Sequence, residues 1–335
     1  MEDLKLKKVS ICVAQYNRAV RIKESIGSLI NQNYQNLEVV VVNDGSPDPS
    51  VQKELESLKC SRLKIIEQKN TGFVRAIKNA ISQSDGEFIY IHGAGDYAAP
   101  ELIKSQVEFL TENLNLAGVG CYYDNVDFDH SPHRKLSSYT PNKTHLTIDD
   151  FKTIYNPLGQ GGTMYRREVY EAAGGYRNFF KYAQDHDLWL RMAELADWAI
   201  LPKTLYSRGY FAKDGVVTNV DKIIYQKALQ EFAIQLSEER SERGKDSLDM
   251  YGEQSALLRV KTKRLSNFYC WKALCLLYSG DATKAQRLSN IAVEEMSSLK
   301  SNLVNFICKL SGNPMAHKLT LWAMRKHPKN KKWAM

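Results

Sequence analysis

The first stretch of the sequence that could do chemistry ends in a single carboxylate, Asp96. Phe88–Ile91 is a run of β-branched and aromatic residues that predicts a buried strand, and Gly93 and Gly95 lie between this run and the acid. Ligands of open α/β sheets bind at the carboxyl ends of strands, so Asp96 is placed to meet a ligand or a metal ion. The alternative is a plain turn in which Asp96 caps a helix that starts near Pro100.

A second such stretch has two acids at the predicted start of a helix. Asp185 and Asp187 precede Leu188 and Leu190, whose spacing suits an amphipathic helix. Negative charge is stabilising in the first turn of a helix, because it interacts favourably with the helix dipole. One of the two acids can therefore be explained as a helix cap alone.

The elements that must position these acids alternate between strand and helix. Strands are predicted over residues 9–14, 37–42, 63–68 and 88–91, with helices between them. The second strand is a nearly continuous apolar run that ends at Asn43 and Asp44, as expected for a parallel strand covered on both faces. The alternation predicts an α/β fold, a parallel sheet with helices on both faces.

The pattern is less regular beyond residue 100. The polar segment 124–150 predicts an irregular loop at the border of a binding cleft, and Gly161 and Gly162 lead into a short strand. From about residue 217 the apolar spacing is helical, with helices predicted over residues 223–236, 256–278 and 282–299. Ser279, Gly280 and Asp281 predict a helix stop followed by an N-cap.

Composition and charge narrow the class of protein. The 335 residues are 43% hydrophobic and 25% charged, as in ordinary globular proteins, and we expect a cytoplasmic chain without secretory signal or spanning helix. Residues 241–335 contain 17 basic and 7 acidic residues, whereas residues 1–240 contain 29 and 31. This excess predicts an anionic membrane surface or phosphorylated lipid as partner and disfavours nucleic acid; the alternative is a solvated basic tail.

Four short motifs follow the predicted strands in register. They are Tyr16-Asn17-Arg18, Asn43-Asp44-Gly45-Ser46, Asn70-Thr71-Gly72 with Arg75 and Asn79, and Gly95-Asp96 four residues before Pro100. Together they resemble the nucleotide-sugar domain of family 2 glycosyltransferases of the GT-A fold. The resemblance implies a Rossmann-like, mostly parallel sheet flanked by helices in residues 1–215. The helical spacing and the basic charge further on predict a helical, basic region in residues 216–335.

The resemblance also implies a donor site for a nucleoside diphosphate sugar. Its donor-binding residues would be Ala14, Tyr16, Arg18, Asp44, Lys69, Gly72, Arg75, Gly95, Asp96, Gly161 and Gly162. Ala14 and Tyr16 would form a shelf for the base and Asp44 would accept its hydrogen bonds. Positive side chains such as Arg75 would face the base-side pocket and the phosphates, although a solvated helix face explains Arg75 and Lys69 equally well.

Catalytic and metal-binding roles follow from the same resemblance. The stretch from Gln184 to Arg191 is similar to the family signature Glu-Asp-x-Asp-Leu-Trp-Leu-Arg, which implies that Asp185 is the catalytic base. Asp96 would hold Mg²⁺ or Mn²⁺ with the diphosphate. Gly93 and Gly95 stand where relatives have two further acids, and Tyr210 where many have a histidine. A metal-free variant that relies on Arg208 and Lys213 therefore stays open.

We therefore expect an inverting hexosyltransferase of the bacterial surface-polysaccharide type, with a UDP-sugar as the first choice of donor. The acceptor would be a hydroxyl of a glycan, in particular a lipid-linked one, at the inner face of the plasma membrane. The rival interpretation is a catalytically degenerate binding module with the same fold. A nucleotidyltransferase is less well supported, because the chain has no glycine-rich phosphate loop followed by a lysine near its N-terminus.

Overall fold

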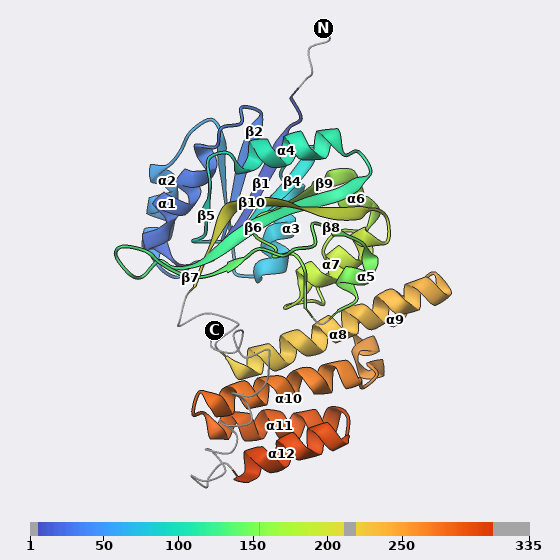
Figure 1. The fold of residues 1–335 in the computed structure, drawn as a ribbon. Coiled ribbons are helices and arrows are strands. Elements are labelled where there is room, and N and C mark those ends of the chain that lie inside the picture. The colour runs from blue at the N-terminus through green and yellow to red at the C-terminus, as the bar shows by residue number, and fades with distance from the viewer. Residues whose placement is uncertain (1–5, 154, 211–218, 311–335) are drawn as a thin grey trace. The chain divides into compact units, whose positions relative to one another are not determined.

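The structure is a computed structural model that describes residues 6–153, 155–210 and 219–310 (Figure 1). By its contacts the chain divides into two compact units, Met1–Gly215 and Val216–Met335. The first contains one mixed sheet with helices on both faces, and the second is helical. Lys213 and the basic tail from residue 311 onward lie outside the described residues.

One sheet with the strand order β3-β2-β1-β4-β9-β6-β10-β5 organises the first unit. Its strands are β1 (Val9–Gln15), β2 (Leu37–Asp44), β3 (Leu63–Gln68), β4 (Phe88–His92), β5 (Tyr97–Ala98), β6 (Leu116–Asp127), β9 (Thr163–Arg166) and β10 (Asp197–Gly209). The strands β3, β2, β1 and β4 are parallel, as are β6 and β10, and β9 is antiparallel to both β4 and β6. The predicted parallel sheet is confirmed, with β9 joining its two parallel parts.

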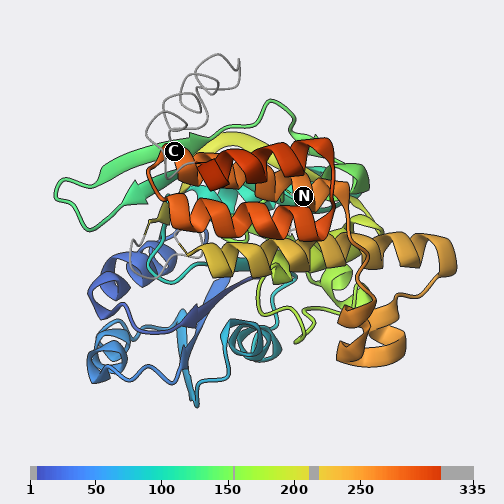
Figure 2. The ribbon, with the colours of Figure 1, turned by 90° about the horizontal axis from the view of Figure 1, so that it is seen from below.

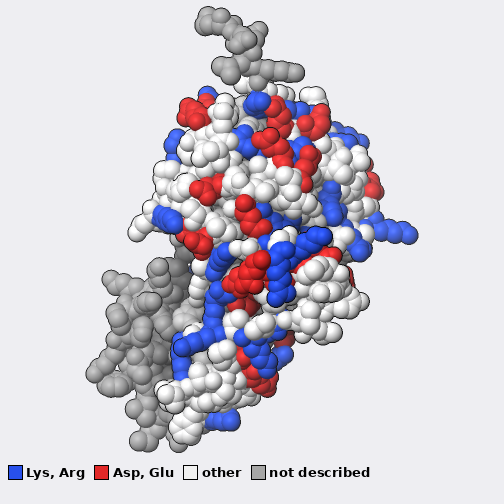
Figure 3. Space-filling view, turned by 90° about the vertical axis from the view of Figure 1, so that its right-hand side faces the viewer, with Lys and Arg blue, Asp and Glu red and all other residues white. Residues whose placement is uncertain are grey.

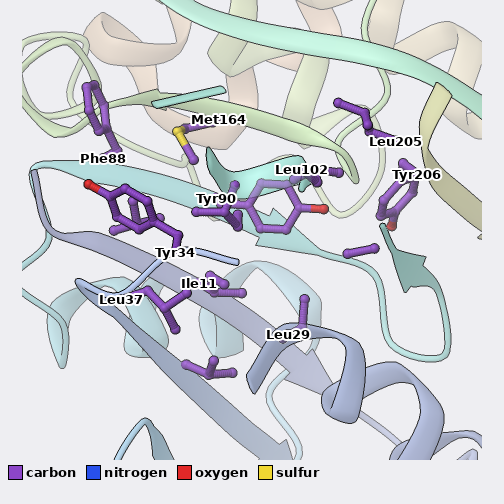
Figure 4. Close-up of a cluster of buried hydrophobic side chains, with 14 of the residues drawn as sticks. Ile11, Leu29, Tyr34, Leu37, Phe88, Tyr90, Leu102, Met164, Leu205 and Tyr206 are labelled. Atoms are coloured by element: carbon purple, nitrogen blue, oxygen red, sulfur yellow. The ribbon is translucent and has the colours of Figure 1, made fainter. Parts of the chain in front are cut away.

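Helices cover both faces of this sheet (Figure 2). They are α1 (Ala19–Ile30), α2 (Pro49–Ser57), α3 (Phe73–Ser82), α4 (Leu102–Glu112), α5 (Ile148–Phe151), α6 (Arg167–Ala172) and α7 (Gln184–Ala193). Alternate residues of the strands, such as Ile11 and Tyr90, join apolar residues of α1, α2 and α4 in one core cluster (Figure 4). Because α3 covers β1 and β2 from the other face, these strands are apolar at nearly every position.

The segment 124–150 is more regular than predicted. After the end of β6, the chain forms β7 (Arg134–Tyr139), which pairs with β6, then β8 (His145–Leu146), which pairs with β10, and then α5. The expectation of an irregular loop was wrong. The polar side chains of an edge hairpin are typical of a strand that faces water, so composition alone does not distinguish such a strand from a loop.

The second unit consists of helices. They are α8 (Val220–Arg243), α9 (Ser247–Tyr251), the 3₁₀-helix η2 (Gly252–Leu258), α10 (Lys263–Tyr278), α11 (Ala282–Glu295) and α12 (Leu299–Leu310). Asp281 caps α11 by accepting a hydrogen bond from the Lys284 amide at 3.0 Å, as predicted. Three predicted helices had wrong boundaries: α8 continues to Arg243, beyond the predicted end at residue 236; α10 begins at Lys263, where Thr262 caps it; and a separate α12 begins where the third helix was expected to end.

The described residues of the second unit have only a small excess of positive charge. These residues, 219–310, contain 14 basic and 11 acidic residues, whereas residues 311–335 contain six basic residues and no acid. Basic and acidic side chains are interspersed on the face that Figure 3 shows. The positive excess therefore comes mainly from the last 25 residues of the sequence.

Candidate functional site

A small pocket lies at the carboxyl ends of β1 and β2. Its volume is about 220 Å³, and it is lined by Ala14, Tyr16, Asp44, Asn70, Gly72 and Phe73. Strands β1 and β2 run parallel with Gln15 opposite Asn43, so the residues after both strands meet at the same edge of the sheet. The structure thus brings together four of the predicted donor-binding residues, with Tyr16 half exposed at 46%.

The carboxylate of Asp44 is buried and organises the loop on the other side of this pocket. One oxygen accepts hydrogen bonds from the Thr71 amide at 2.9 Å and from Gln68 Nε2 at 2.7 Å, and the other accepts from the Gly72 amide at 2.9 Å. Gly72 has a φ of +88° and is the residue before α3, where glycine is favoured. Asp44 therefore fixes the backbone that borders the pocket.

The predicted cationic residues lie in different places. Lys69 and Arg75 are exposed beside the loop that Asp44 holds, and neither lines the pocket. Arg18 has a left-handed backbone conformation with a φ of 60°, and its Nη1 donates a 2.8 Å hydrogen bond to the Ala94 carbonyl. Arg18 therefore joins the loop after β1 to the glycine-containing loop after β4.

The carboxylate of Asp96 is 7% exposed, and both of its oxygens accept hydrogen bonds. Oδ1 accepts from the Gly209 amide at 2.7 Å, and Oδ2 accepts from the Tyr206 hydroxyl. Burial raises the pKa of Asp96 to about 6, although these two hydrogen bonds and the charges of Arg208 and Arg18 act in the opposite direction. Asp96 thus ties the end of β4 to the end of β10.

Three glycines make room for this connection. A Cβ atom on Gly93 would lie 2.1 Å from Asp96 Oδ2, and one on Gly161 would lie 2.0 Å from the Tyr206 hydroxyl oxygen. Gly162, with a φ of +81°, lies against the same ring. Gly161 and Gly162, two of the predicted donor-binding residues, thus pack closely against Tyr206, a residue for which no role was predicted from the sequence.

Asp185 is half-buried in the first turn of α7, a helix that begins directly after Ala183 with its left-handed φ of 58°. Its Oδ2 accepts from Asn156 Nδ2 at 3.0 Å and its Oδ1 from the His186 amide at 2.9 Å. The neighbouring Gln184 donates to Gln160 Oε1 at 2.8 Å. The first turn of α7 is thereby held against the loop that precedes β9.

Asp187, in contrast, is a structural residue. It is 1% exposed and forms a buried ion pair with Arg177 and with Arg191, whose Nη2 lies 2.7 Å from Asp187 Oδ2. Burial alone would raise the pKa of Asp187, but the two guanidinium groups hold it at about 2. Of the two acids at the start of α7, only Asp185 is accessible enough to act on a substrate.

Residues 10–174 match the family described as Glycosyl transferase family 2. The chain carries a family 2 glycosyltransferase domain. An uncharacterized glycosyltransferase of Haemophilus influenzae is 30% identical over 205 residues, 59% of this chain and 64% of that protein. The chondroitin synthase of Pasteurella multocida is 25% identical over 215 residues, 64% of this chain and 22% of the synthase. The match thus spans less than two thirds of either relative.

Solved structures support the GT-A fold for the glycosyltransferase domain. The mannosyltransferase PcManGT from Pyrobaculum calidifontis, in complex with GDP-Man and Mn²⁺, has a TM-score of 0.54 at 16% identity, covering 95% of this chain and 84% of its own. Residues 1–349 of Staphylococcus aureus TarS, in complex with UDP-GlcNAc, have a TM-score of 0.55 at 16% identity, covering 95% and 92%. At this level of identity the likeness shows the fold alone.

The residues around Asp96 in the glycosyltransferase domain do not fit a divalent cation held by the protein. Mg²⁺ and Mn²⁺ are bound by carboxylate and carbonyl oxygens, whereas both Asp96 oxygens accept a hydrogen bond in a buried position and would have to share or lose it to hold a cation. No group of three or more His, Cys, Asp or Glu within the described ranges could hold a metal. His92 is buried, and burial lowers its pKa to about 4, so it is a neutral residue of the core.

Proposed function

We propose that this chain is an inverting glycosyltransferase that moves a hexose from a nucleotide-sugar to a hydroxyl of a glycan acceptor. The observation that carries the proposal is the combination, in one family 2 domain, of the pocket at the ends of β1 and β2 with an accessible Asp185. The pocket has an aromatic residue, Tyr16, and a backbone edge, which suit a flat base. A UDP-sugar is our first choice of donor, since a solved structure with this fold contains UDP-GlcNAc.

The chemistry assigned to Asp185 is general-base catalysis. Its carboxylate takes the proton of the acceptor hydroxyl while the hydroxyl oxygen attacks the anomeric carbon from the face opposite the nucleotide. The bond from this carbon to the diphosphate breaks, and its electron pair leaves with the nucleoside diphosphate. Asn156 and the His186 amide hold the carboxylate in one orientation, which is what a positioned base requires.

An Asp185→Asn variant tests this assignment. It should lower turnover by about 10²-fold or more while nucleotide binding stays within about twofold, because the amide cannot accept the proton. The matched control is Asp149→Asn, which removes an exposed acid from the first turn of α5. Full turnover in Asp185→Asn would disprove the assignment of the base.

The donor is tested by a thermal-shift panel of UDP, GDP, CDP and dTDP, each with Mn²⁺ or with EDTA. A ligand that binds only the native state stabilises it by about 2.7 kcal/mol at one hundred times its Kd, so a real site is visible. The buried hydrogen bonds of Asp96 favour, as a second candidate, a binding module without catalysis. Nucleotide binding without transfer to any glycan acceptor would support that candidate.

A lipid-linked acceptor at an anionic membrane surface completes the proposal. Among the described residues no helix is long and apolar enough to span a membrane. On α12, however, Leu299, Leu303, Phe306 and Leu310 are 93, 59, 58 and 44% exposed and recur at helical spacing. Residues 296–335 contain eight basic residues and no acid. Two of these basic residues, Lys300 and Lys309, belong to α12 itself. An exposed apolar stripe beside basic residues suits the interface of an anionic bilayer.

Vesicle sedimentation tests the role of α12. We expect the full chain to bind vesicles that contain phosphatidylglycerol and not vesicles of phosphatidylcholine alone. The double variant Leu303→Gln/Phe306→Gln should weaken this binding several-fold, whereas Leu257→Gln/Leu258→Gln, which removes two other exposed leucines, should not. Equal binding of both variants would exclude the face of α12 as the membrane contact.

A further inference from the structure

The packing around Asp96 explains why the neighbouring acids are absent. An acid at position 93 would have to place its Cβ 2.1 Å from Asp96 Oδ2 and 3.1 Å from the Tyr206 hydroxyl oxygen. Gly95 has a φ of +88°, which disfavours any residue with a side chain. The loop after β4 is therefore built without a second carboxylate, and the one that it has is used to hold β10.

Two guanidinium groups, those of Arg18 and Arg208, lie near Asp96. Arg18 Nη1 donates to the Ala94 carbonyl within the loop itself, so its charge is fixed beside Asp96. Arg208 precedes Gly209, whose amide donates to Asp96. The charges of both arginines lower the pKa of Asp96, so both guanidinium groups lie close enough to act on this carboxylate electrostatically.

Arg208 is exposed but held in a defined position. Its Nε donates a 2.8 Å hydrogen bond to Asn125 Oδ1, and its guanidinium carbon lies 5.1 Å from the centre of the Tyr123 ring. Tyr123 in turn stacks on Tyr139 of β7 at a distance of 4.9 Å between ring centres. The hydrogen bond to Asn125 uses only Nε, so the terminal amino groups of Arg208 remain available to an anionic ligand.

Arg21 is a different case. It is 8% exposed, forms an ion pair with Glu24 and lies 3.9 Å from the centre of the Phe128 ring. Its charge is therefore balanced within the protein, and the loop after β4 gains no net positive charge from it.

We propose that Arg18 and Arg208 bind the diphosphate of the donor in place of a divalent cation, so that donor binding and transfer do not depend on metal. The inference rests on the proposed function and adds the means by which the leaving group is stabilised. Arginine is always charged and its planar group matches two phosphate oxygens at once. The same contacts strengthen as negative charge develops on the departing diphosphate.

Calorimetric titration of the full chain with UDP and GDP, in Mn²⁺ and in EDTA, tests this inference. We expect the Kd of the nucleotide that binds to agree within about threefold between the two conditions. Binding that is more than about tenfold tighter in Mn²⁺ would overturn the inference while supporting the proposed function. Absence of binding by both nucleotides in both conditions, together with no thermal shift by any of UDP, GDP, CDP and dTDP, would overturn both.

Arginine variants identify the groups that replace the metal. Arg208→Gln should weaken binding of the nucleoside diphosphate about tenfold and leave binding of the corresponding nucleoside unchanged, since only the former has the anionic group. Arg208→Lys should lose less. Lys203→Gln removes an exposed cation from the same strand, β10, and should change neither. Equal effects of Arg208→Gln and Lys203→Gln would contradict the assignment of Arg208.

Discussion

Two buried aspartates at the carboxyl edge of the same sheet have different partners. Asp44 accepts hydrogen bonds from residues 68–72 and borders an open pocket. Asp96 accepts from Tyr206 and Gly209, more than one hundred residues further along the chain, so both of its oxygens are engaged within the protein. The comparison teaches that the place of an acid at a strand end does not by itself decide its role. The role of such an acid depends on its hydrogen-bond partners, which place it either beside an open pocket or in a contact between two strand ends.

The largest expected effect comes from placing a second acid in the loop after β4. Gly93→Asp should destabilise the protein by about 3 kcal/mol or more, because the new side chain collides with Asp96 and adds a like charge. Urea unfolding measures the change. Gly27→Ala in α1, where nothing lies within 4 Å of an added Cβ, is the control and should be neutral or slightly stabilising. A stable Gly93→Asp would show that the loop can rearrange.

Removal of the other aspartate should affect both stability and binding. Asp44→Ala leaves the Thr71 and Gly72 amides without their acceptor, which we expect to cost about 2 to 3 kcal/mol. Because these amides border the pocket, nucleotide affinity should fall in parallel. Urea unfolding measures the loss of stability, and calorimetry on the same variant measures nucleotide affinity. If Asp44 had a purely structural role, the folded fraction would keep its nucleotide affinity.

The pKa of Asp96 predicts a pH dependence of opposite sign to that of an ion-paired acid. Its pKa is about 6 in the folded protein against an ordinary value of 3.8, so the folded state binds the proton more tightly. The protonated side chain of Asp96 therefore adds about 2 to 3 kcal/mol to the free energy of unfolding. This stabilisation is fully present below about pH 4 and is lost as the pH rises through 6. Asp96→Asn should remove this slope from unfolding curves measured between pH 4 and 6. An unchanged slope would assign it to another group.

The smallest expected effect comes from removing one hydroxyl, which donates a hydrogen bond to Asp96 and accepts one from the Gly93 amide at 3.2 Å. Tyr206→Phe keeps the ring against Gly161 and Gly162 and removes only the hydroxyl, which we expect to cost about 1.5 kcal/mol. The variant also frees one oxygen of Asp96. If nucleotide binding then becomes dependent on Mn²⁺, the tyrosine is what keeps a cation out of the loop. If binding stays independent of metal, the arginines alone are sufficient.

The sequence predicted the parts of the molecule that depend on local order. Strands β1 to β4 and the residues that follow them were recognisable because their apolar runs and turn residues are contiguous. The partners of Asp96 were not, because Tyr206 is 110 residues away and its contact depends on strand pairing. The hairpin of β6 and β7 was missed because its polar composition is that of a loop, and strand pairing makes it regular. The break before α10 was missed because the apolar spacing continues across it, and the cap at Thr262 sets the start of the helix.

The hydrogen bond between Asp96 and Tyr206 has a consequence for folding during synthesis of the chain. Strands β1 to β4 and the pocket beside Asp44 consist of residues that leave the ribosome early. At about 5 to 20 residues per second, the 110 residues that separate Asp96 from Tyr206 take roughly 6 to 20 s to synthesise. During that interval Asp96 lacks the two partners that it has in the folded protein, and water solvates its carboxylate. The emergence of β10 is therefore the event that allows the sheet of the first unit to close around Asp96.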